Sequence, residues 1–418
     1  MSIQAVPSTI AEHIARVTEV DSLPPVELPL ERCDGLIVAA DVYAKLPVPA
    51  FDNSAMDGFA VAAESLRSDE ETVRLQVHQD IPAGISPESL APGTACRIMT
   101  GAALPAGADT VIPVEDTDSS PGPRPLPATV ELPANREPGA FVRRCGADVA
   151  KGDLLLRRGE RLDPAALAAA ASGGWGALRV VPRPRVAIVS TGAELATPGT
   201  IPPPGHIPDS NTVLLTTLVR RWGGDPVAVR VDKDEAQEVG RTLAEIAESA
   251  DLIITSGGIS AGAFDPLKEL ATTEGGSELR FFRLRQQPGG PQAWGSIAGT
   301  PYIGLPGNPV SVFVSGLLYA QPTIALLGGA HGAQADRLRR EPVTVPATAG
   351  ADFPRLANRR RYVPVRLNEG VATPVHADRS ASHLIASLHL ANALLLVEEG
   401  TQHERVMTQG TRGRAIIL

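Results

Sequence analysis

The sequence predicts a multidomain protein that combines a doubly wound α/β domain with separate β-rich parts. Between residues 183 and 328, apolar runs with strand character alternate with runs of helical periodicity, a pattern typical of a parallel sheet covered by helices. Before and after this stretch, short β-like runs are separated by turns that contain glycine and proline. With 418 residues, of which 43% are hydrophobic, the chain has enough material for several cores.

Charge and cysteine content exclude several functional classes. The net charge is −9 and no long basic run is present, so we expect no binding of nucleic acid through its phosphates. The short run Arg359–Arg361 is interpreted as a solvated edge. The three cysteines form neither a metal-ligand pattern nor a disulfide framework. Because neither a leader nor a bilayer-spanning apolar run is recognised, we expect a cytoplasmic protein without direct membrane insertion.

The first part of the chain alternates between helical and β-like patterns. Residues 7–20 predict an amphipathic helix capped by Ser8 or Thr9, and residues 30–40 have a second helix-like pattern. Strand-like runs at a spacing of about ten residues then predict a small β-rich domain; they cover residues 73–77, 94–99, 110–114 and 129–132.

The middle of the chain begins with a short Ala-rich helix, for which Asp163 is the expected N-cap and Pro164 the first helical residue. In the α/β part, the continuous apolar run 185–190 predicts a strand buried on both faces. Further strands are expected at 227–231, 252–255 and 302–305, and helices at 211–222, 235–249 and 310–326. In the first of these helices, the side chains expected to face the core are Val213, Leu214, Leu218 and Val219.

The last part, residues 342–418, shows short β-like alternation again and predicts a small β-barrel or sandwich.

Three loops follow strands of the predicted sheet at its carboxyl edge, where open α/β sheets bind ligands. They are Ser190–Glu194, Ser256–Ser260 and Gly304–Pro309, the last of which opens directly into a helix. A glycine-rich turn before a helix exposes unpaired N–H groups that suit phosphate. One such loop could be only a tight turn, but three at one edge predict a site for an anionic small molecule. None matches a Walker A or dinucleotide-binding motif, so neither an ATPase nor a dehydrogenase is favoured.

Four acids near these loops could contribute to a Mg²⁺ site, because Mg²⁺ typically takes one or two carboxylates and fills its other positions with water and substrate oxygens. Each could equally be a helix cap or a surface charge. Glu194 and Asp265 are favoured because each stands beside a glycine-rich loop; the other two are Asp209 and Asp232.

The β-rich part contains two segments with polar residues in a dense arrangement. Phe51–Val61 holds two acids, an asparagine and a serine, a composition that Asx-turns alone could also explain. The second segment, Cys96–Ala102, places an arginine and a threonine beside a glycine.

Together these segments resemble the molybdopterin molybdenumtransferase family of the MoeA type, which also forms the C-terminal part of gephyrin. The resemblance rests on Phe51–Val61, Arg97–Ala102, Ser190–Leu195, Ser256–Ser260 with Asp265, and Gly304–Ser311, and it extends over nearly the whole chain. It implies a homodimer with four subdomains in each chain. These are an elongated linker (1–50 and 138–182), a β-rich subdomain (51–137), an α/β molybdopterin-binding domain (183–328) and a C-terminal β-barrel (336–418).

The family's activity is the insertion of molybdate into adenylylated molybdopterin, with Mg²⁺ assisting and AMP released. The resemblance places the active site between the α/β domain of one chain and the β-rich domain of the other, with a molybdopterin adenylyltransferase as a candidate partner. The implied catalytic residues are Asp57, Thr100, Asp148, Glu194 and Asp232, and the implied metal ligands are Glu194 and Asp265. The ligand-binding residues expected from the loops and the resemblance are Ser190, Thr191, Gly192, Ser256, Gly257, Gly258, Ser260, Pro306, Gly307, Asn308, Pro309 and Ser382.

The chain departs from the family at charged positions. The family's Lys-Pro-Gly-Lys-Pro run reads Gln287-Pro288-Gly289-Gly290-Pro291 here, so both ammonium groups are absent. Arg283 or Arg285 could reach the same place, although charge-assisted hydrogen bonds are about twice as strong as the neutral bond that a glutamine donates. Three acids of the family are replaced by Ala147, Ala193 and Ala263.

These departures leave two interpretations. In the favoured one, the protein is an insertase with a retuned site. In the other, it is a gephyrin-like dimeric scaffold with weakened or lost activity, whose cleft binds a peptide tail of a cytoskeletal, cell-division or membrane-receptor protein. A nucleotide hydrolase with a related α/β domain is a third class, against which the β-rich segments argue.

Overall fold

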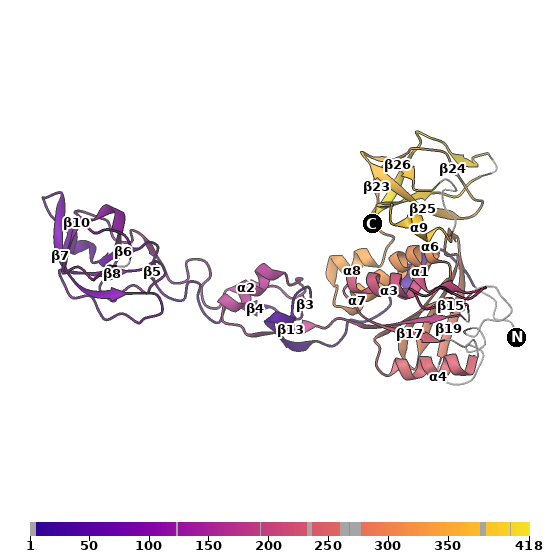
Figure 1. Ribbon diagram of the computed structural model, residues 1–418, viewed down its shortest axis with the longest axis horizontal. Coiled ribbons are helices and arrows are strands. Elements are labelled where there is room, and N and C mark those ends of the chain that lie inside the picture. The colour runs from indigo at the N-terminus through magenta and orange to yellow at the C-terminus, as the bar shows by residue number, and fades with distance from the viewer. Residues whose placement is uncertain are drawn as a thin grey trace. The chain divides into compact units, whose positions relative to one another are not determined.

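The computed structural model describes residues 6–122, 124–192, 194–231, 236–259, 267, 277–376, 382–401 and 403–418 (Figure 1). The chain divides into two compact units. The first consists of Met1–Val26, Gly35–Ala39 and Val180–Leu418, and the second of Glu27–Asp34 and Ala40–Arg179.

The centre of the first unit is a seven-stranded sheet with the order β1-β19-β21-β22-β18-β14-β17. The predicted parallel strands are confirmed as β14 (Arg185–Thr191), β17 (Asp225–Val231), β18 (Leu252–Ser256) and β22 (Thr300–Leu305). The sheet is mixed, because β21 (Pro291–Ile297) runs antiparallel to β22 and to β19 (Ser277–Leu284). The sequence did not predict these two strands, nor β1 (Val6–Ser8), which pairs with β19.

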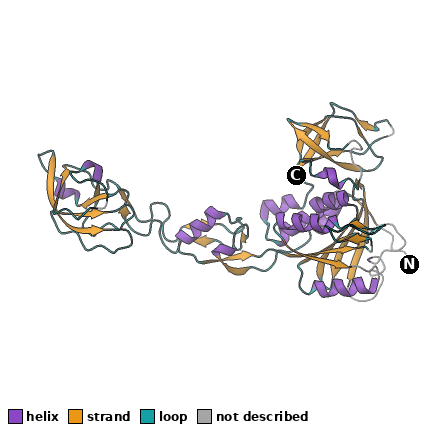
Figure 2. Ribbon diagram, viewed as in Figure 1, coloured by secondary structure: helices purple, strands orange, loops and turns teal. Residues whose placement is uncertain are grey.

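Helices cover both faces of this sheet, as the doubly wound pattern predicts (Figures 1 and 2). On one face pack α1 (Ile10–Val17), α3 (Ser210–Arg221) and the helical run from α6 (Pro309–Ser315) through η4 (Gly316–Ala320) to α7 (Gln321–Leu327). On the opposite face lies α4 (Ala236–Ala247). The carboxyl edge of the sheet is left open for loops.

Helix α3 corrects one detail of the prediction. Val213 was expected to face the core, but its side chain is 53% exposed, and Leu215 is buried in its place. Asp209 caps the helix by accepting from the Thr212 N–H at 3.0 Å, and this start sets the inward face at Asn211, Leu215, Leu218 and Val219. These positions have the i, i+4, i+7, i+8 spacing of one helix face.

The predicted helix at 310–326 is confirmed as the continuous run Pro309–Leu327. A π-helical segment, η4, interrupts the run and ends at Ala320, two residues before Pro322, which lacks the N–H that a regular helix would use at that point. The run has 19 residues and a mean hydropathy of 1.6, which are also properties of a membrane span, but 78% of its most apolar window is buried inside the protein. It is a core helix.

The N-terminal helix begins later than predicted. Thr9 is its N-cap and forms a capping box with Glu12, while Ser8 ends strand β1. The buried residues of α1 include Ile14 and Val17, which belong to the core between the sheet and its helices, and His13, which lies against Phe282 and Tyr319.

The helix expected at residues 30–40 is wrong. Only a short turn of helix, η1 (Leu30–Arg32), forms there, and β3 (Ile37–Val38) follows it. The turn between them contains Gly35 in the left-handed region, with φ of 73°, which ends helical geometry.

In the second unit, all four predicted β segments are confirmed as strands of one sheet. Its order is β10 (Thr129–Pro133), β7 (Thr72–Ile81), β8 (Thr94–Ile98), β6 (Gly58–Val61) and β9 (Thr110–Pro113). The Ala-rich helix α2 (Pro164–Ser172) has Asp163 as its N-cap, as predicted. Short strand pairs complete the unit; they are β4 (Val42–Tyr43) with β12 (Leu154–Leu156) and β5 (Asn53–Ser54) with β11 (Val142–Arg143).

The C-terminal part is a barrel, which decides between the two expected architectures. The pairing of β25 (Arg360–Asn368) with β27 (Ala393–Val397) closes a ring that also contains β26 (Val371–Pro374), β23 (Val345–Ala349) and β29 (Arg412–Ile417). A two-residue strand, β20 (Gln286–Gln287), pairs in parallel with β25. The segment between β19 and β21 is thereby tied to the barrel.

Candidate functional site

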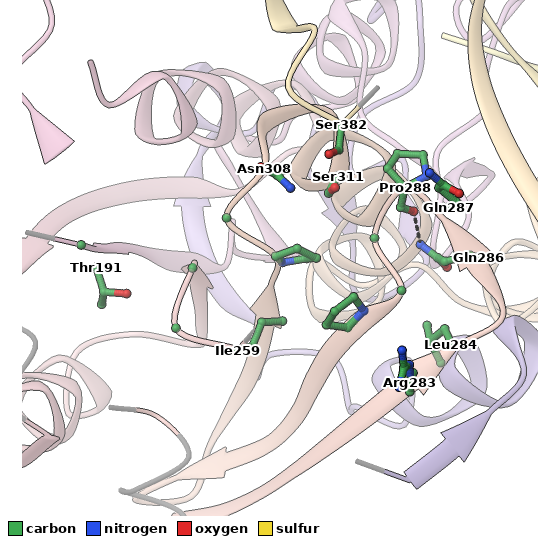
Figure 3. Close-up of a pocket in the computed structure, with 18 of the residues that line it drawn as sticks. Thr191, Ile259, Arg283, Leu284, Gln286, Gln287, Pro288, Asn308, Ser311 and Ser382 are labelled. Carbon is green, nitrogen blue, oxygen red and sulfur yellow. Dashed lines mark hydrogen bonds between the residues drawn. The ribbon is translucent and has the colours of Figure 1, made fainter. Parts of the chain in front are cut away.

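A cavity of about 570 Å³ lies at the carboxyl edge of the sheet in the first unit (Figure 3). Figure 3 shows Thr191 and Ile259 on one side of it, Gln287 and Pro288 on the other, and Asn308, Ser311 and Ser382 between them. The three loops singled out in the sequence therefore meet, and they are joined by the segment after β19 and by the C-terminal part.

The first loop contributes Thr191, Gly192 and Glu194 to the cavity wall. Ser190 and Ser256, both expected to bind ligand, are buried beneath the wall, where their hydroxyl groups lie 3.4 Å apart. Ser190 is also hydrogen-bonded to the Thr212 hydroxyl. These two serines hold β14, β18 and α3 together and do not line the cavity.

The second loop contributes Gly257, Gly258 and Ile259. The Gly257 N–H donates to the Leu305 carbonyl at 3.0 Å, which joins this loop to the end of β22. Gly258 has φ of 68°, and a Cβ there would approach Leu267 Cδ1 to 2.8 Å. Only glycine allows the backbone to reach the cavity at this point.

The third loop contributes Pro306, Gly307 and Asn308 and leads into α6, of which Pro309 is the first residue and does not line the cavity. It is held from two sides: Asn211 Nδ2 donates to the Gly307 carbonyl at 2.7 Å, and the Val310 N–H donates to the Ser382 carbonyl at 3.0 Å. The loop presents the amino end of the 19-residue helical run Pro309–Leu327 to the cavity, which favours an anion there.

The described residues that line the cavity carry a net positive charge. Among the described residues that line it, the cations are Arg283 and Arg359 and the anion is Glu194. Arg283, named as a replacement for the missing ammonium groups, is placed in the wall, whereas Arg285 is not among the lining residues. An anionic ligand is therefore favoured even without the two lysines.

The interpretation of Arg359–Arg361 as a solvated edge holds for Arg359, which is exposed, but is wrong for Arg360, which is half-buried, and for Arg361, which is buried. Arg359 lines the cavity. Arg360 is paired with Glu341 and, at 2.8 Å, with Glu398. Arg361 is 7% exposed and donates to the Pro354 carbonyl. Arg360 and Arg361 are the first residues of β25, whereas Arg359 directly precedes the strand and lines the cavity.

The candidate residues Asp57, Thr100 and Asp148 belong to the second unit and do not line this cavity. Asp57 Oδ1 accepts from the Thr100 N–H at 2.7 Å and from the Thr100 hydroxyl at 2.9 Å, so these two predicted residues form a pair. Asp148 is exposed. Asp52 lies in the same segment as Asp57, and its pKa is held below its ordinary value by a hydrogen bond from the Cys145 N–H and, next, by Arg144.

Metal-binding capacity within the described part rests on Glu194. Asp209 is occupied as the cap of α3, because its carboxylate accepts from both the N–H and the hydroxyl of Thr212. Asp232, Ser260 and Asp265 lie outside the described residues. No group of three potential ligands among His, Cys, Asp and Glu occurs in the described ranges. A single carboxylate fits Mg²⁺ only together with oxygens of the substrate and water.

Sequence reasoning missed several lining residues, among them Ile259, Gln286, Ser311 and Arg359. Ser311 lies in the first turn after the predicted loop and could have been found from its position. Arg359 could not, because the pairing of β20 with β25 brings it to a loop of a different part.

Comparison with known proteins agrees with the geometry. Three family models match: the MoeA N-terminal region (domains I and II) over residues 2–174, a probable molybdopterin-binding domain over 187–325, and the MoeA C-terminal region (domain IV) over 346–406. Molybdopterin molybdenumtransferase 2 of Mycobacterium tuberculosis is 39% identical over 409 residues, which cover 96% of this chain and 98% of that protein.

Two further relatives are similar over most of their length. The molybdopterin molybdenumtransferase of a Nostoc species is 37% identical over 75% of this chain and 72% of its own. The crystal structure of a molybdopterin biosynthesis MoeA protein from Pyrococcus horikosii superposes with a TM-score of 0.77, at 28% identity and with 99% of each chain covered.

Proposed function

The chain belongs to the molybdopterin molybdenumtransferase family of the MoeA type, and we propose that it inserts molybdate into adenylylated molybdopterin with release of AMP. The observation that carries the assignment is the cavity at the carboxyl edge of the sheet. Its volume, about 570 Å³, lies within the usual range for small-molecule sites. Its three glycine- and proline-containing loops and its two arginines suit a ligand that carries phosphate and an oxyanion.

Individual roles follow from the lining. The loops Gly257–Ile259 and Pro306–Asn308 supply backbone donors, and Thr191 and Ser382 supply hydroxyl groups. Arg283 and Arg359 offset charge on the phosphoryl oxygens and on molybdate.

We also propose Mg²⁺ at Glu194. A carboxylate beside a phosphate-binding loop matches the preference of Mg²⁺ for one or two carboxylates and substrate oxygens. The ion would supply charge neutralisation on the phosphoanhydride that is broken when AMP is released. Asp232 and Asp265 remain predictions as further acids of this site.

The Asp57–Thr100 pair supports a homodimer in which a second copy of the chain completes the cavity. The pair does not line the cavity of the first unit, and exposed apolar side chains occur in the same unit as the pair: Phe51 is 50%, Met99 42% and Phe141 47% exposed. We propose that these side chains belong to the contact area between the two copies. We propose that Asp57 and Thr100 of one copy, with Asp148, act at the cavity of the other. The proposed location is the cytoplasm, and a molybdopterin adenylyltransferase remains a candidate partner.

The gephyrin-like alternative is not favoured. The relatives described above are named for the transferase activity or for molybdopterin biosynthesis, and two of the three match nearly the whole chain. A peptide tail of a cytoskeletal, cell-division or membrane-receptor protein would leave the polar loops of the cavity without a purpose.

Substitution of Glu194 tests the proposed site. In an assay that supplies adenylylated molybdopterin, molybdate and Mg²⁺, Glu194→Gln should lower turnover by about 100-fold and raise the Mg²⁺ concentration needed for half-maximal rate. The control is Glu245→Gln, an exposed position on α4 that should leave turnover unchanged. Equal Mg²⁺ dependence of the three proteins would remove Glu194 from the proposed metal site.

A further inference from the structure

The loop that replaces the family's lysine-containing run rests on a cluster of buried polar side chains. Gln292 Nε2 donates to the Gly289 carbonyl at 2.8 Å and to the Ser315 hydroxyl at 2.7 Å. Gln286 Nε2 donates to the Pro288 carbonyl at 3.0 Å, a contact visible in Figure 3, and Tyr319 donates its hydroxyl to Gln286 Oε1. Burial raises the pKa of Tyr319, so its hydroxyl remains a donor.

These side chains are not explained by packing. Gln286 and Gln292 are each 1% exposed, and Ser315 and Tyr319 are fully buried. Burial of an amide is unfavourable unless hydrogen bonds replace its contacts with water, and an apolar side chain would fill the space at lower cost. Gln292 Oε1 even lacks a partner within the described residues. The two glutamines are therefore best understood through what their amide groups hold, which is the backbone of the loop.

The orientation of the loop follows from these contacts. Its carbonyl groups at Pro288 and Gly289 accept from the buried glutamines, and the Gly290 carbonyl accepts from the Leu284 N–H at 2.8 Å. The peptide bonds Pro288–Gly289 and Gly289–Gly290 are trans. In a trans peptide the N–H points away from the carbonyl of the same unit. With the carbonyls turned toward the core, the N–H groups of Gly289 and Gly290 turn outward, and both residues line the cavity.

Two further observations agree with this orientation. Within the described residues, neither of these N–H groups has an acceptor. Gly289 has φ of 86°, and a Cβ there would lie 2.4 Å from Ser315 Oγ and 2.9 Å from Gln286 Nε2. The cluster thus closes around a glycine and leaves its amide facing the cavity. Adjacent outward N–H groups form a concave site for an oxyanion.

We propose that Gln286 and Gln292 are positioning residues that turn the N–H groups of Gly289 and Gly290 into the cavity, where they bind a tetrahedral oxyanion in place of the two absent ammonium groups. The identity of this oxyanion as molybdate rests on the proposed function. The arrangement exchanges mobile charged side chains for fixed backbone dipoles, which need no reorganisation when the anion binds.

Removal of the buried amides is the direct test. Gln292→Leu and Gln286→Leu keep the volume but release the loop, and each should raise the KM for molybdate by about 100-fold, with a much smaller change in the KM for adenylylated molybdopterin. Ser315→Ala, the smallest change, should act in the same direction. Gln321→Leu, the same exchange in α7 away from the cavity, is the matched control. Thermal unfolding of each variant verifies that it folds.

A second substitution distinguishes a role of the glutamines in positioning the loop from a general role in stability. Gly290 has no positive φ, and a Cβ there would make only ordinary contacts, of 3.4 Å or more, so a side chain is tolerated. Gly290→Lys introduced into Gln292→Leu should raise molybdate affinity at least tenfold, since the ammonium group donates to the anion in place of the N–H groups that no longer face it. Failure of this rescue, or an unchanged KM for molybdate in both leucine variants, would overturn the proposal.

Direct titration with molybdate separates the proposal from the proposed function. If the wild-type protein binds molybdate without turnover and the leucine variants do not bind it, the inference stands and the transferase assignment fails. If the wild-type protein turns over and the leucine variants bind molybdate with unchanged affinity, the assignment stands and the inference is wrong.

Discussion

Among single residues, His13 is a buried histidine whose protonation is suppressed by the fold. Its side chain is 0% exposed and lies against Phe282 and Tyr319, with ring centroids 5.1 and 4.7 Å away. Neither ring nitrogen has a hydrogen-bond partner in the described part of the chain. Burial, with a smaller contribution from Arg16, lowers the pKa of His13 from 6.5 to about 3. The folded protein therefore holds this histidine neutral at the base of the α/β core.

This shift predicts a dependence of stability on pH. Below about pH 6.5 the unfolded chain binds a proton at His13 that the folded chain cannot bind until about pH 3. The free energy of unfolding should therefore fall on acidification through this window, by up to about 1.4 kcal/mol per pH unit from this group. Denaturant unfolding at several pH values should show that the free energy of unfolding changes less with pH in His13→Phe than in the wild-type protein. An equal dependence on pH in the two proteins would show that the pKa of His13 is not lowered in the folded state.

The polar residues of the site show how far residue-level prediction reaches. Thr191, Gly257 and Asn308 were expected to bind ligand and line the cavity, whereas Ser190 and Ser256 lie beneath it. The two serines lie at the ends of strands, where successive side chains point to opposite faces of the sheet. A shift of one residue therefore decides whether a hydroxyl group faces the cavity or is buried beneath it. Sequence alone gives the loop but not which of its hydroxyl groups faces inward.

At the scale of elements, helix α3 links stability to the site. Asp209 is 4% exposed and caps the helix, and Asn211 in its first turn donates to the Gly307 carbonyl in the third loop. A capped start of α3 therefore also fixes the ligand loop.

Loss of this cap should be measurable. Asp209→Ala should lower the free energy of unfolding of the first unit by about 1–2 kcal/mol and weaken ligand binding, because the first turn of α3 frays. Asp163→Ala removes the equivalent cap of α2, in the second unit, and should cost similar stability there without affecting the ligand. Chemical denaturation and ligand titration of both variants check this. Equal ligand affinity in the two variants would show that α3 does not position the loop.

Elements with a long apolar or amphipathic pattern could be predicted, and short or mixed ones could not. β14 and Pro309–Leu327 appear as expected because each is a continuous apolar run. β19 and β21 escaped prediction because they form an antiparallel pair, whereas the expected alternation of strands and helices describes only parallel strands. The helical pattern at 30–40 failed because Gly35 and a local strand pairing outweigh weak propensity.

At the scale of the whole molecule, the cavity draws on residues that are distant in the chain. Thr191, Gly290, Arg359 and Ser382 all line it. The pairing of β20 with β25 brings Arg359 to the cavity, and the hydrogen bond from the Val310 N–H to the Ser382 carbonyl holds Ser382 there. Sequence periodicity does not reveal contacts between distant segments, which is why the sequence alone places Arg359 at a solvated edge and not in a site.

A site shared between two copies can be tested by mixing variants of low activity. Asp57→Ala and Glu194→Gln should each retain little activity alone, but after subunit exchange a mixed dimer contains one cavity with both residues intact. A one-to-one mixture should recover about a quarter of wild-type turnover, since about half of the dimers are mixed and each has one intact site. A mixture no more active than its components, although the subunits exchange, would place Asp57 outside the site of the second copy.

A single turnover by the wild-type protein decides whether this cavity inserts molybdate. Purified protein is incubated with stoichiometric adenylylated molybdopterin, excess molybdate and Mg²⁺, and AMP and protein-free molybdenum cofactor are quantified together. The cavity described here predicts equimolar formation of both products, dependent on molybdate. AMP and cofactor both absent under these conditions, with a folded protein, would contradict the assignment of this cavity as an insertase site.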